Sequence, residues 1–445
     1  MLDPTIVLLA LSVCFGLLAT YRLLVLRFPH PLDLAIVSVL YYSLPLALLA
    51  TVIGDSSGNV LLNLAAADPQ IALRSMQYAL LACVSAYAGL LVAKLLSRST
   101  PRLRFALLQQ DEIKTHIFAL LLLGLIVLGI ILFGPATYFS GYNVESQAGS
   151  AASGTALIYS SIEMLGLVIA YSFLISRGLN RRPNYKLIGI IMLALLSLAV
   201  VRGKRLEIIS AFLPLGILIF ATSRFFGSTR GRLLSVLGAA VLISMMASLR
   251  FGEMPTPASI AFNLVSEGLF AGHSLPGVIE RLNAGQLEYE YGARIGAGLL
   301  AVIPRFVWPS KDELLYTGDE ALKDLSPLGA TNILAEVVLQ GGAIAVILWF
   351  LCVGFVFERV YQSLHGFDAA LAARRLPAMF IVYLVIMCSF IPHFRDGLVP
   401  AMKISLQTLI FFFVISGIRL LPSPTWIIRR LIPMGRRPID EPHSR

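Results

Sequence analysis

The sequence predicts an all-α protein, a polytopic integral membrane helical bundle of about 11 transmembrane helices with one long periplasmic loop. Two observations lead to this class. The 445-residue chain is 57% hydrophobic and only 13% charged, with a mean hydropathy of +0.82, and a soluble domain could not cover its surface with that composition. Apolar runs of roughly 15 to 24 residues also recur along the whole chain, as transmembrane helices require.

The apolar runs divide the chain into four parts. We expect transmembrane helices 1–8 in residues 1–249, the long loop in 250–327, helices 9–11 in 328–420 and a basic cytoplasmic tail in 421–445. The first run has no basic segment before it and no small-residue cleavage site after it, so it is interpreted as a retained helix. The expected spans are 5–22, 33–53, 75–96, 116–134, 155–176, 187–201, 208–223, 233–249, 328–357, 376–391 and 401–418.

The charges in the loops give an orientation. Alternate loops and the C-terminal tail hold 23 of the 35 lysines and arginines, and the opposite set of loops holds 12. Because cytoplasmic loops carry the excess of positive charge, we expect the N-terminus in the periplasm and the C-terminus in the cytoplasm. The expected location is therefore the bacterial inner membrane.

The long loop contains one short apolar segment, Ile295–Ile303, which is too short to span a membrane and is interpreted as an interfacial or re-entrant helix. A true span there would invert the topology of everything that follows. Directly after it stands the string Pro304-Arg305-Phe306-Val307-Trp308-Pro309-Ser310-Lys311.

Several classes of function are not supported. The four cysteines lie inside apolar runs and show neither disulfide nor metal spacing, and the sequence contains no HExxH, CxxC, Walker or nucleophile-elbow motif. We therefore expect no metal and no cofactor. The net charge of +10 lies in loops and tail without interleaved aromatic residues, so nucleic acid is not an expected partner.

Residues 202–205 read Arg-Gly-Lys-Arg and lie between two apolar runs, at the expected periplasmic turn of a helical hairpin. Cations on the outer side oppose the usual charge rule, which favours Arg202, Lys204 and Arg205 as an anion site. Guanidinium groups suit phosphate because their planar fork donates two hydrogen bonds. The alternative is that these side chains reach toward lipid headgroups from the helix ends.

Other outer segments carry further candidates. Arg305, Lys311 and Arg395 are additional outward cations, and His393 stands two residues before Arg395 in a short outer loop. Glu163 and Glu336 are carboxylates within spans. Asn332 and Gln340, at i−4 and i+4 from Glu336, complete a polar stripe that is either interhelical glue or the wall of a site.

Together these features resemble the oligosaccharide repeat-unit polymerases, the O-antigen polymerase family of bacterial envelopes, and more distantly the O-antigen ligases. The resemblance covers roughly residues 187–400. It rests on the Arg202–Arg205 turn, on the string Ile303-Pro304-Arg305-Phe306-Val307-Trp308-Pro309-Ser310-Lys311, and on Ala335-Glu336-Val337-Val338-Leu339-Gln340-Gly341-Gly342 at the start of the next span.

The resemblance implies a glycosyltransferase that polymerises undecaprenyl-pyrophosphate-linked repeat units into O-antigen, capsule or exopolysaccharide on the periplasmic side. Donor and acceptor would both be lipid-linked glycans, and a chain-length-regulating membrane protein and a flippase would be further partners. Arginines would stabilise the leaving pyrophosphate, and a carboxylate or histidine would accept the proton of the acceptor hydroxyl. The pyrophosphate-binding candidates are Arg202, Lys204, Arg205, Arg305, Lys311 and Arg395, and the catalytic candidates are Glu336, Glu163 and His393.

Three alternatives stay open. A ligase would carry a histidine in the stretch entering the span after the long loop, where this chain reads Ala330-Thr331-Asn332-Ile333. A lipid-linked sugar or anion transporter would place charged residues along both halves of a central pathway and show internal symmetry. A purely structural membrane subunit would leave the outward arginines unexplained.

Overall fold

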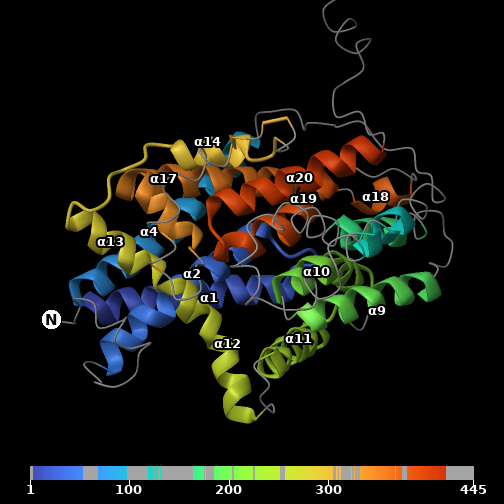
Figure 1. Cartoon of the computed structure of the whole chain (residues 1–445), viewed down its shortest axis with the longest axis horizontal. Coiled ribbons are helices and arrows are strands. Elements are labelled where there is room, and N and C mark those ends of the chain that lie inside the picture. Colours follow the sequence, from blue (N-terminus) through green and yellow to red (C-terminus); the bar gives the residue numbers. More distant parts are fainter. Residues whose placement is uncertain are drawn as a thin grey trace, which may run out of the picture.

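The computed structural model describes residues 4–53, 69–97, 119–124, 126–128, 131, 164–174, 176, 185–202, 205–223, 226–250, 256–303, 307–308, 310–311, 322, 325, 331–365, 367–372 and 378–416. Over these residues the regular structure is helical throughout, which confirms the predicted all-α class (Figure 1). The elements are α1 (Pro4–Val25), α2 (Pro31–Ile53), α4 (Pro69–Ser97), α9 (Tyr185–Arg202), α10 (Arg205–Thr222), α11 (Thr229–Arg250), α12 (Pro257–Gly272), α13 (Ser274–Asn283), α14 (Ala293–Leu300), α17 (Ile333–Gln362), α18 (Phe367–Ala372), α19 (Ala378–Val385), the π-helix η1 (Ile386–Phe390), the 3₁₀-helix η2 (Pro392–Arg395) and α20 (Leu398–Ser416).

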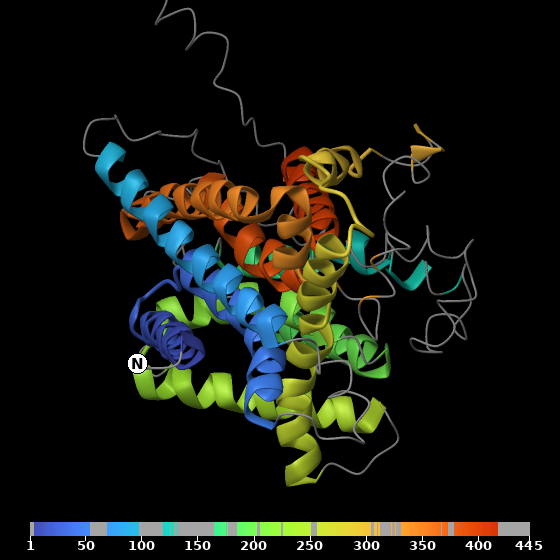
Figure 2. The same ribbon diagram turned by 90° about the vertical axis from the view of Figure 1, so that its left-hand side faces the viewer.

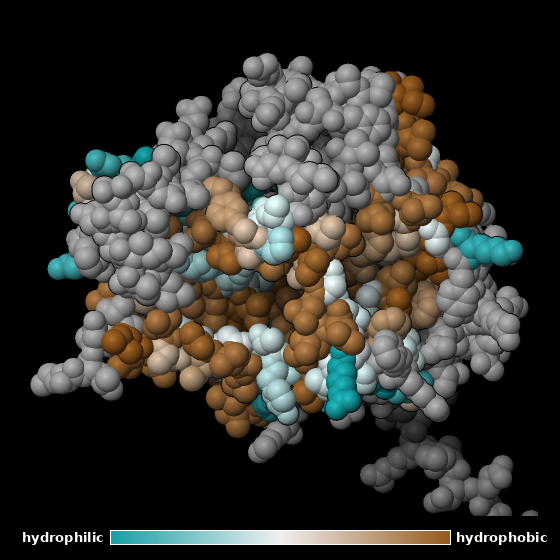
Figure 3. Space-filling model, turned by 90° about the horizontal axis from the view of Figure 1, so that it is seen from below, coloured by the Kyte–Doolittle hydropathy of each residue, from teal (hydrophilic) through white to brown (hydrophobic). Residues whose placement is uncertain are grey.

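Three helices are long and apolar enough to cross a membrane: Ile6–Val25 of α1, Gln70–Ser97 of α4 and Ile333–Gln362 of α17. Shorter apolar helices surround them, including Pro31–Leu46, Ile208–Thr222 and Leu398–Ile410. Figure 3 shows apolar side chains over much of the described face that α11 and α12 contribute to, as expected where lipid is the solvent. These are the features of a membrane protein, and the count of eleven spans stays a prediction.

The helices α4 and α17 pack closely against each other, with α2 against both (Figure 2). Two glycines let the backbones of the pair touch. A Cβ atom on Gly354 would lie 1.9 Å from the carbonyl oxygen of Ala86, and one on Gly89 would lie 2.0 Å from that of Leu351. Small residues permit this approach, which is how helices associate in lipid without a hydrophobic driving force.

Alanine at position 354 is expected to force α4 and α17 apart and to cost about 1–3 kcal/mol of stability. The thermal midpoint of the purified protein in detergent, followed by circular dichroism, measures this effect. Gly238→Ala in α11 is the matched control, because a Cβ atom there meets nothing within 4 Å. Alanine favours the helix at such a site, so its midpoint should stay unchanged or rise. Equal midpoints for the two variants would contradict the close packing of α4 on α17.

Residues 250–327 hold more regular structure than the sequence analysis expected. The short apolar segment is indeed helical, as α14, and its 8 residues are too few to cross a membrane. Two further helices, α12 and α13, precede it. α12 begins with a capping box: the Thr256 side chain accepts from the backbone N–H of Ser259, and the Ser259 hydroxyl accepts from the backbone N–H of Thr256. Pro257 occupies the first helical position.

The long axis of the molecule has two distinct ends, which Figure 1 marks by α13 on one side and α18 on the other. At the α13 end, Arg74 near the start of α4 donates to Asn283 at the end of α13 over 2.9 Å. At the α18 end, Arg27 after α1 pairs with Asp368 of α18, with 2.8 Å between Nη2 and Oδ1. Each end holds a polar network, and apolar side chains of α2, α4 and α17 fill the space between these helices.

Candidate functional site

Four side chains at the α13 end form a buried cluster that we call the α17 cluster: Glu290, Arg294, Glu336 and Gln340. Arg294 binds both acids, with Nε 2.9 Å from Glu290 Oε2 and Nη1 3.5 Å from Glu336 Oε1. Gln340 donates to Glu290 over 2.8 Å. The side chains of Arg294 and Glu336 are only 7% and 5% exposed, so each charge depends on the other for stabilisation.

Glu336 also links two helices. Its Oε2 accepts a hydrogen bond of 2.7 Å from the backbone N–H of Leu398, the first residue of α20. A carboxylate at this position satisfies an otherwise unpaired donor and complements the helix dipole. Gly397 makes this approach possible, because its φ is +100° and a Cβ atom there would lie 2.3 Å from Glu336 Oε1. The start of α20 is therefore fixed to the start of α17.

The predicted polar stripe of α17 divides into two roles. Gln340 and Glu336 belong to the α17 cluster, whereas Asn332 caps the helix by accepting from the backbone of Ala335 over 2.9 Å. The amide of Asn332 also donates to the carbonyl oxygens of Tyr42 and Ala271, over 3.2 and 3.1 Å. Asn332 is therefore the interhelical glue that one of the two readings predicted.

His393 lies in η2, a few residues before Gly397, and forms a pair with Asp396. Its Nδ1 is 2.9 Å from Asp396 Oδ2, and its side chain is 8% exposed against 30% for the acid. An ionised carboxylate only accepts hydrogen bonds, so the proton sits on Nδ1 and the basic lone pair on Nε2. This is the arrangement in which a carboxylate orients a histidine for proton transfer.

A second buried histidine near this end is less suited to proton transfer. His273 lies between α12 and α13, and burial lowers its pKa to about 4. It therefore stays neutral at neutral pH and is a weak base there. Its Nε2 has no hydrogen-bond partner within the part of the chain that the structure describes.

The Arg202–Arg205 turn lies where the sequence predicts a hairpin. α9 ends at Arg202 and α10 begins at Arg205, and the two helices pack together. α10 also packs against η1 and η2, so the helix that Arg205 opens lies beside the segment that carries His393. The side chains of Arg202 and Arg205 lie outside the described residues, as do Lys204, Arg305 and Glu163.

The two remaining predicted cations are described. Arg395 lies half-buried in η2, two residues from His393. Lys311 is buried, and its ammonium donates to the carbonyl oxygen of Ala301 over 2.9 Å and to that of Ile303. These carbonyls directly follow α14, so Lys311 stabilises the C-terminal end of that helix. Its part in pyrophosphate binding stays a prediction beside this structural role.

Arg294 and Glu290 were not among the predicted site residues. Their i,i+4 spacing is typical of an ion pair on a helix face, but Glu290 precedes the first residue of α14, so the two residues do not share one helix. Their link to Glu336 had no signal in the sequence, because 42 residues separate Arg294 from Glu336.

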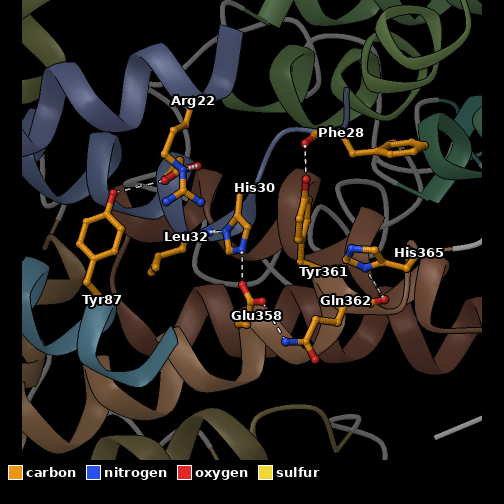
Figure 4. A network of polar contacts seen from close by, with 10 residues as sticks. Arg22, Phe28, His30, Leu32, Tyr87, Glu358, Tyr361, Gln362 and His365 are labelled. Atoms are coloured by element: carbon orange, nitrogen blue, oxygen red, sulfur yellow. Dashed lines mark hydrogen bonds and ion pairs between the residues drawn. The ribbon is translucent and has the colours of Figure 1, made fainter. Parts of the chain in front are cut away.

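The second polar network, at the α18 end, was not predicted at all (Figure 4). His30 Nε2 is 2.9 Å from Glu358 Oε2, and its Nδ1 accepts from the backbone N–H of Leu32 over 3.1 Å. Because Nδ1 accepts, the proton lies on Nε2 and is donated to Glu358. His30 thus caps α2 and attaches the start of that helix to the end of α17.

Further bonds fix the segment between α1 and α2. Arg22 Nε lies 3.0 Å from Asp33 Oδ2, the Tyr361 hydroxyl donates to the carbonyl oxygen of Phe28 over 3.4 Å, and the Tyr383 hydroxyl donates to that of Pro29 over 2.9 Å. Arg232 at the start of α11 donates to the carbonyl oxygens of residues 24, 26 and 27. These contacts join α1, α2, α11 and α17 to one another. The polar network at the α18 end therefore has a structural role.

Comparisons with protein-family models, with curated proteins and with solved structures gave no match to this chain. The class of protein that the fold defines is a helical membrane protein with a buried arginine–carboxylate cluster and an oriented histidine at one end.

Proposed function

We propose that this protein is a membrane glycosyltransferase that polymerises undecaprenyl-pyrophosphate-linked repeat units, with its α13 end on the periplasmic side of the bacterial inner membrane. One observation carries the proposal. The segment before α14, the start of α17 and the η2–α20 junction meet at the α13 end: Arg294 binds Glu336, Glu336 binds the start of α20, and the His393–Asp396 pair lies in the segment directly before α20.

The chemistry requires a base and an anion site. His393 Nε2 accepts the proton of the acceptor hydroxyl, whose oxygen forms the new bond to the anomeric carbon of the donor glycan. The bond from that carbon to the lipid pyrophosphate breaks, and the electron pair leaves with the pyrophosphate. Preorganised cations stabilise this developing charge. In this proposal they are Arg395 from η2 and the hairpin cations Arg202, Lys204 and Arg205, with Arg305 and Lys311 in supporting positions.

Among the three catalytic candidates, the geometry favours His393. Glu336 is bound to Arg294 and to the start of α20, so it is better placed to position the η2–α20 junction than to accept a substrate proton. His393, in contrast, pairs with Asp396 through Nδ1, the arrangement in which a carboxylate orients a histidine for proton transfer.

The transporter alternative receives less support. A transporter needs polar groups along a path between the two sides, and its helices must move against one another. Here apolar side chains fill the space among α2, α4 and α17, where backbones touch at Gly89 and Gly354. The ionisable groups at the α18 end bind helices to one another. Among the described residues they do not continue as a row of polar groups toward the α13 end.

The gene deletion separates polymerase from ligase. Cells without the protein should accumulate single lipid-linked repeat units and make no long polysaccharide. Long chains that fail only to reach their final lipid acceptor would instead identify a ligase, and a normal polysaccharide would exclude both. Complementation with Arg205→Ala or Arg305→Ala should fail at normal protein level. Arg230→Ala, which removes an exposed arginine at the start of α11, should restore long chains.

A further inference from the structure

The segment Glu288–Gly292, which leads into α14, is held firmly against α17. The N–H of Glu290 donates to the carbonyl oxygen of Leu339 over 3.0 Å. The side-chain oxygen of Gln340 accepts from the N–H groups of Gly292 and Arg294, over 2.9 and 3.3 Å. With the two side-chain bonds of Glu290, these contacts fix the backbone of the segment on the α17 cluster.

Two tyrosines of this fixed segment face outward. Tyr289 and Tyr291 flank the inward-facing Glu290, and their rings lie 6.1 Å apart at an interplanar angle of 61°. Tyr289 is 42% exposed and Tyr291 is 82% exposed. The backbone of Tyr291 has φ of +44°, an uncommon conformation for a bulky residue, which the surrounding structure must impose.

A break in α17 makes room for this pair. Gly341 and Gly342 both have non-helical backbone angles, with φ of +60° and ψ of −139° at Gly342, so the helix is interrupted directly after Gln340. A Cβ atom on Gly342 would lie 3.2 Å from the Tyr289 hydroxyl, so the glycine lets this ring lie over the break. The tyrosines and the α17 cluster therefore share one support, the kinked start of α17.

We propose that Tyr289, Tyr291 and the exposed carboxylate of Glu288 form a saccharide subsite that holds a sugar ring of the glycan beside the reacting end. This inference rests on the proposed function and adds to it the site of the sugar. Tyrosine offers a rigid amphipathic surface at low entropic cost, suited to a ligand with an apolar C–H face and hydroxyl edges. The carboxylate of Glu288 can accept hydrogen bonds from those hydroxyls.

The charge of the segment argues for a sugar over a lipid headgroup. Interfacial tyrosines often anchor membrane proteins among headgroups. Glu290 is paired with Arg294, but Glu288 is exposed and residues 286–292 contain no cation, so the charge of Glu288 would repel lipid phosphates and a pyrophosphate alike. The segment suits a hydroxyl-rich ligand, whereas the pyrophosphate belongs with the arginines of η2 and the α9–α10 hairpin.

Binding of a lipid-free glycan tests the subsite. The probe is the oligosaccharide released by mild acid from the lipid-linked repeat units of the source strain, titrated against the full chain in detergent. The double variant Tyr289→Ala/Tyr291→Ala should raise the Kd about tenfold, as for loss of ring stacking. The double variant Tyr289→Phe/Tyr291→Phe keeps both rings and should retain most of the affinity. Tyr21→Ala removes a tyrosine of α1 that is 63% exposed, and should change nothing.

The outcomes separate this inference from the proposed function. An unchanged Kd in the folded double-alanine variant, or no binding by the wild-type chain, overturns the subsite even if gene deletion abolishes polymer. If the deletion strain still makes long polysaccharide, the polymerase fails, and tyrosine-dependent binding would then support the subsite alone. If the double-alanine variant binds the oligosaccharide normally but is lost from membranes, the tyrosines are lipid anchors and the subsite is wrong.

Discussion

Replacing His393 with alanine is expected to lower the rate of polymer formation by about 10²–10⁴-fold, because the acceptor hydroxyl loses the group that takes its proton. Asp396→Asn should also lower the rate, since the amide no longer holds the proton on Nδ1 of His393. The measurement is the initial rate of chain extension by the purified protein in proteoliposomes that contain lipid-linked repeat units.

A matched histidine provides the control for that experiment. His365 lies at the α18 end, exposed, with Nδ1 2.9 Å from the carbonyl oxygen of Gln362. His365→Ala should polymerise at the wild-type rate. If folded His393→Ala protein retains the wild-type rate, the base is elsewhere, and Glu163 or Glu336 becomes the candidate to examine.

Arg294→Met is expected to cost about 3–5 kcal/mol of stability, because it leaves the buried Glu336 and the partly buried Glu290 without their shared cation. The thermal midpoint in detergent should fall accordingly. Arg74→Met is the matched control at the same end: Arg74 is exposed and donates one hydrogen bond, to Asn283. Loss of an exposed partner of this kind costs about 1 kcal/mol or less.

Neutralising the acids should reverse the effect. Glu290→Gln and Glu336→Gln added to Arg294→Met remove the unpaired charges, and the amide oxygen at position 336 can still accept from Leu398. We expect most of the lost midpoint to return in this triple variant. If the Arg294→Met and Arg74→Met variants have the same thermal midpoint, the α17 cluster does not stabilise the α13 end as described.

Much of the helical framework could be read from hydropathy. The break at residues 202–205 follows from two apolar runs around three cations. In the structure, α9 ends at Arg202 and α10 begins at Arg205. The ninth predicted span, 328–357, is shifted by five residues from α17. Hydropathy could not place the start of α17, because the side-chain cap of Asn332 sets it. It could not place the end either, because the hydrogen bond from His30 satisfies the buried Glu358 and the helix continues past that residue.

Other elements depend on contacts that a single sequence does not show. The predicted span 376–391 is divided into α19 and the π-helix η1, and η2 follows it directly, a break that places His393 beside α20. The polar residues of α17 were predicted as a stripe. Which of them binds Arg294 and which caps the helix is decided by α14, α20 and α2, elements far away in the chain.

That this protein extends lipid-linked glycans is our proposal. Its most direct test is the purified wild-type chain in proteoliposomes that contain undecaprenyl-pyrophosphate-linked repeat units and no other protein, with the products separated by size. The account predicts a ladder of polymers with release of undecaprenyl pyrophosphate, and loss of that ladder in the His393→Ala variant. Folded wild-type protein that leaves only single repeat units would contradict it.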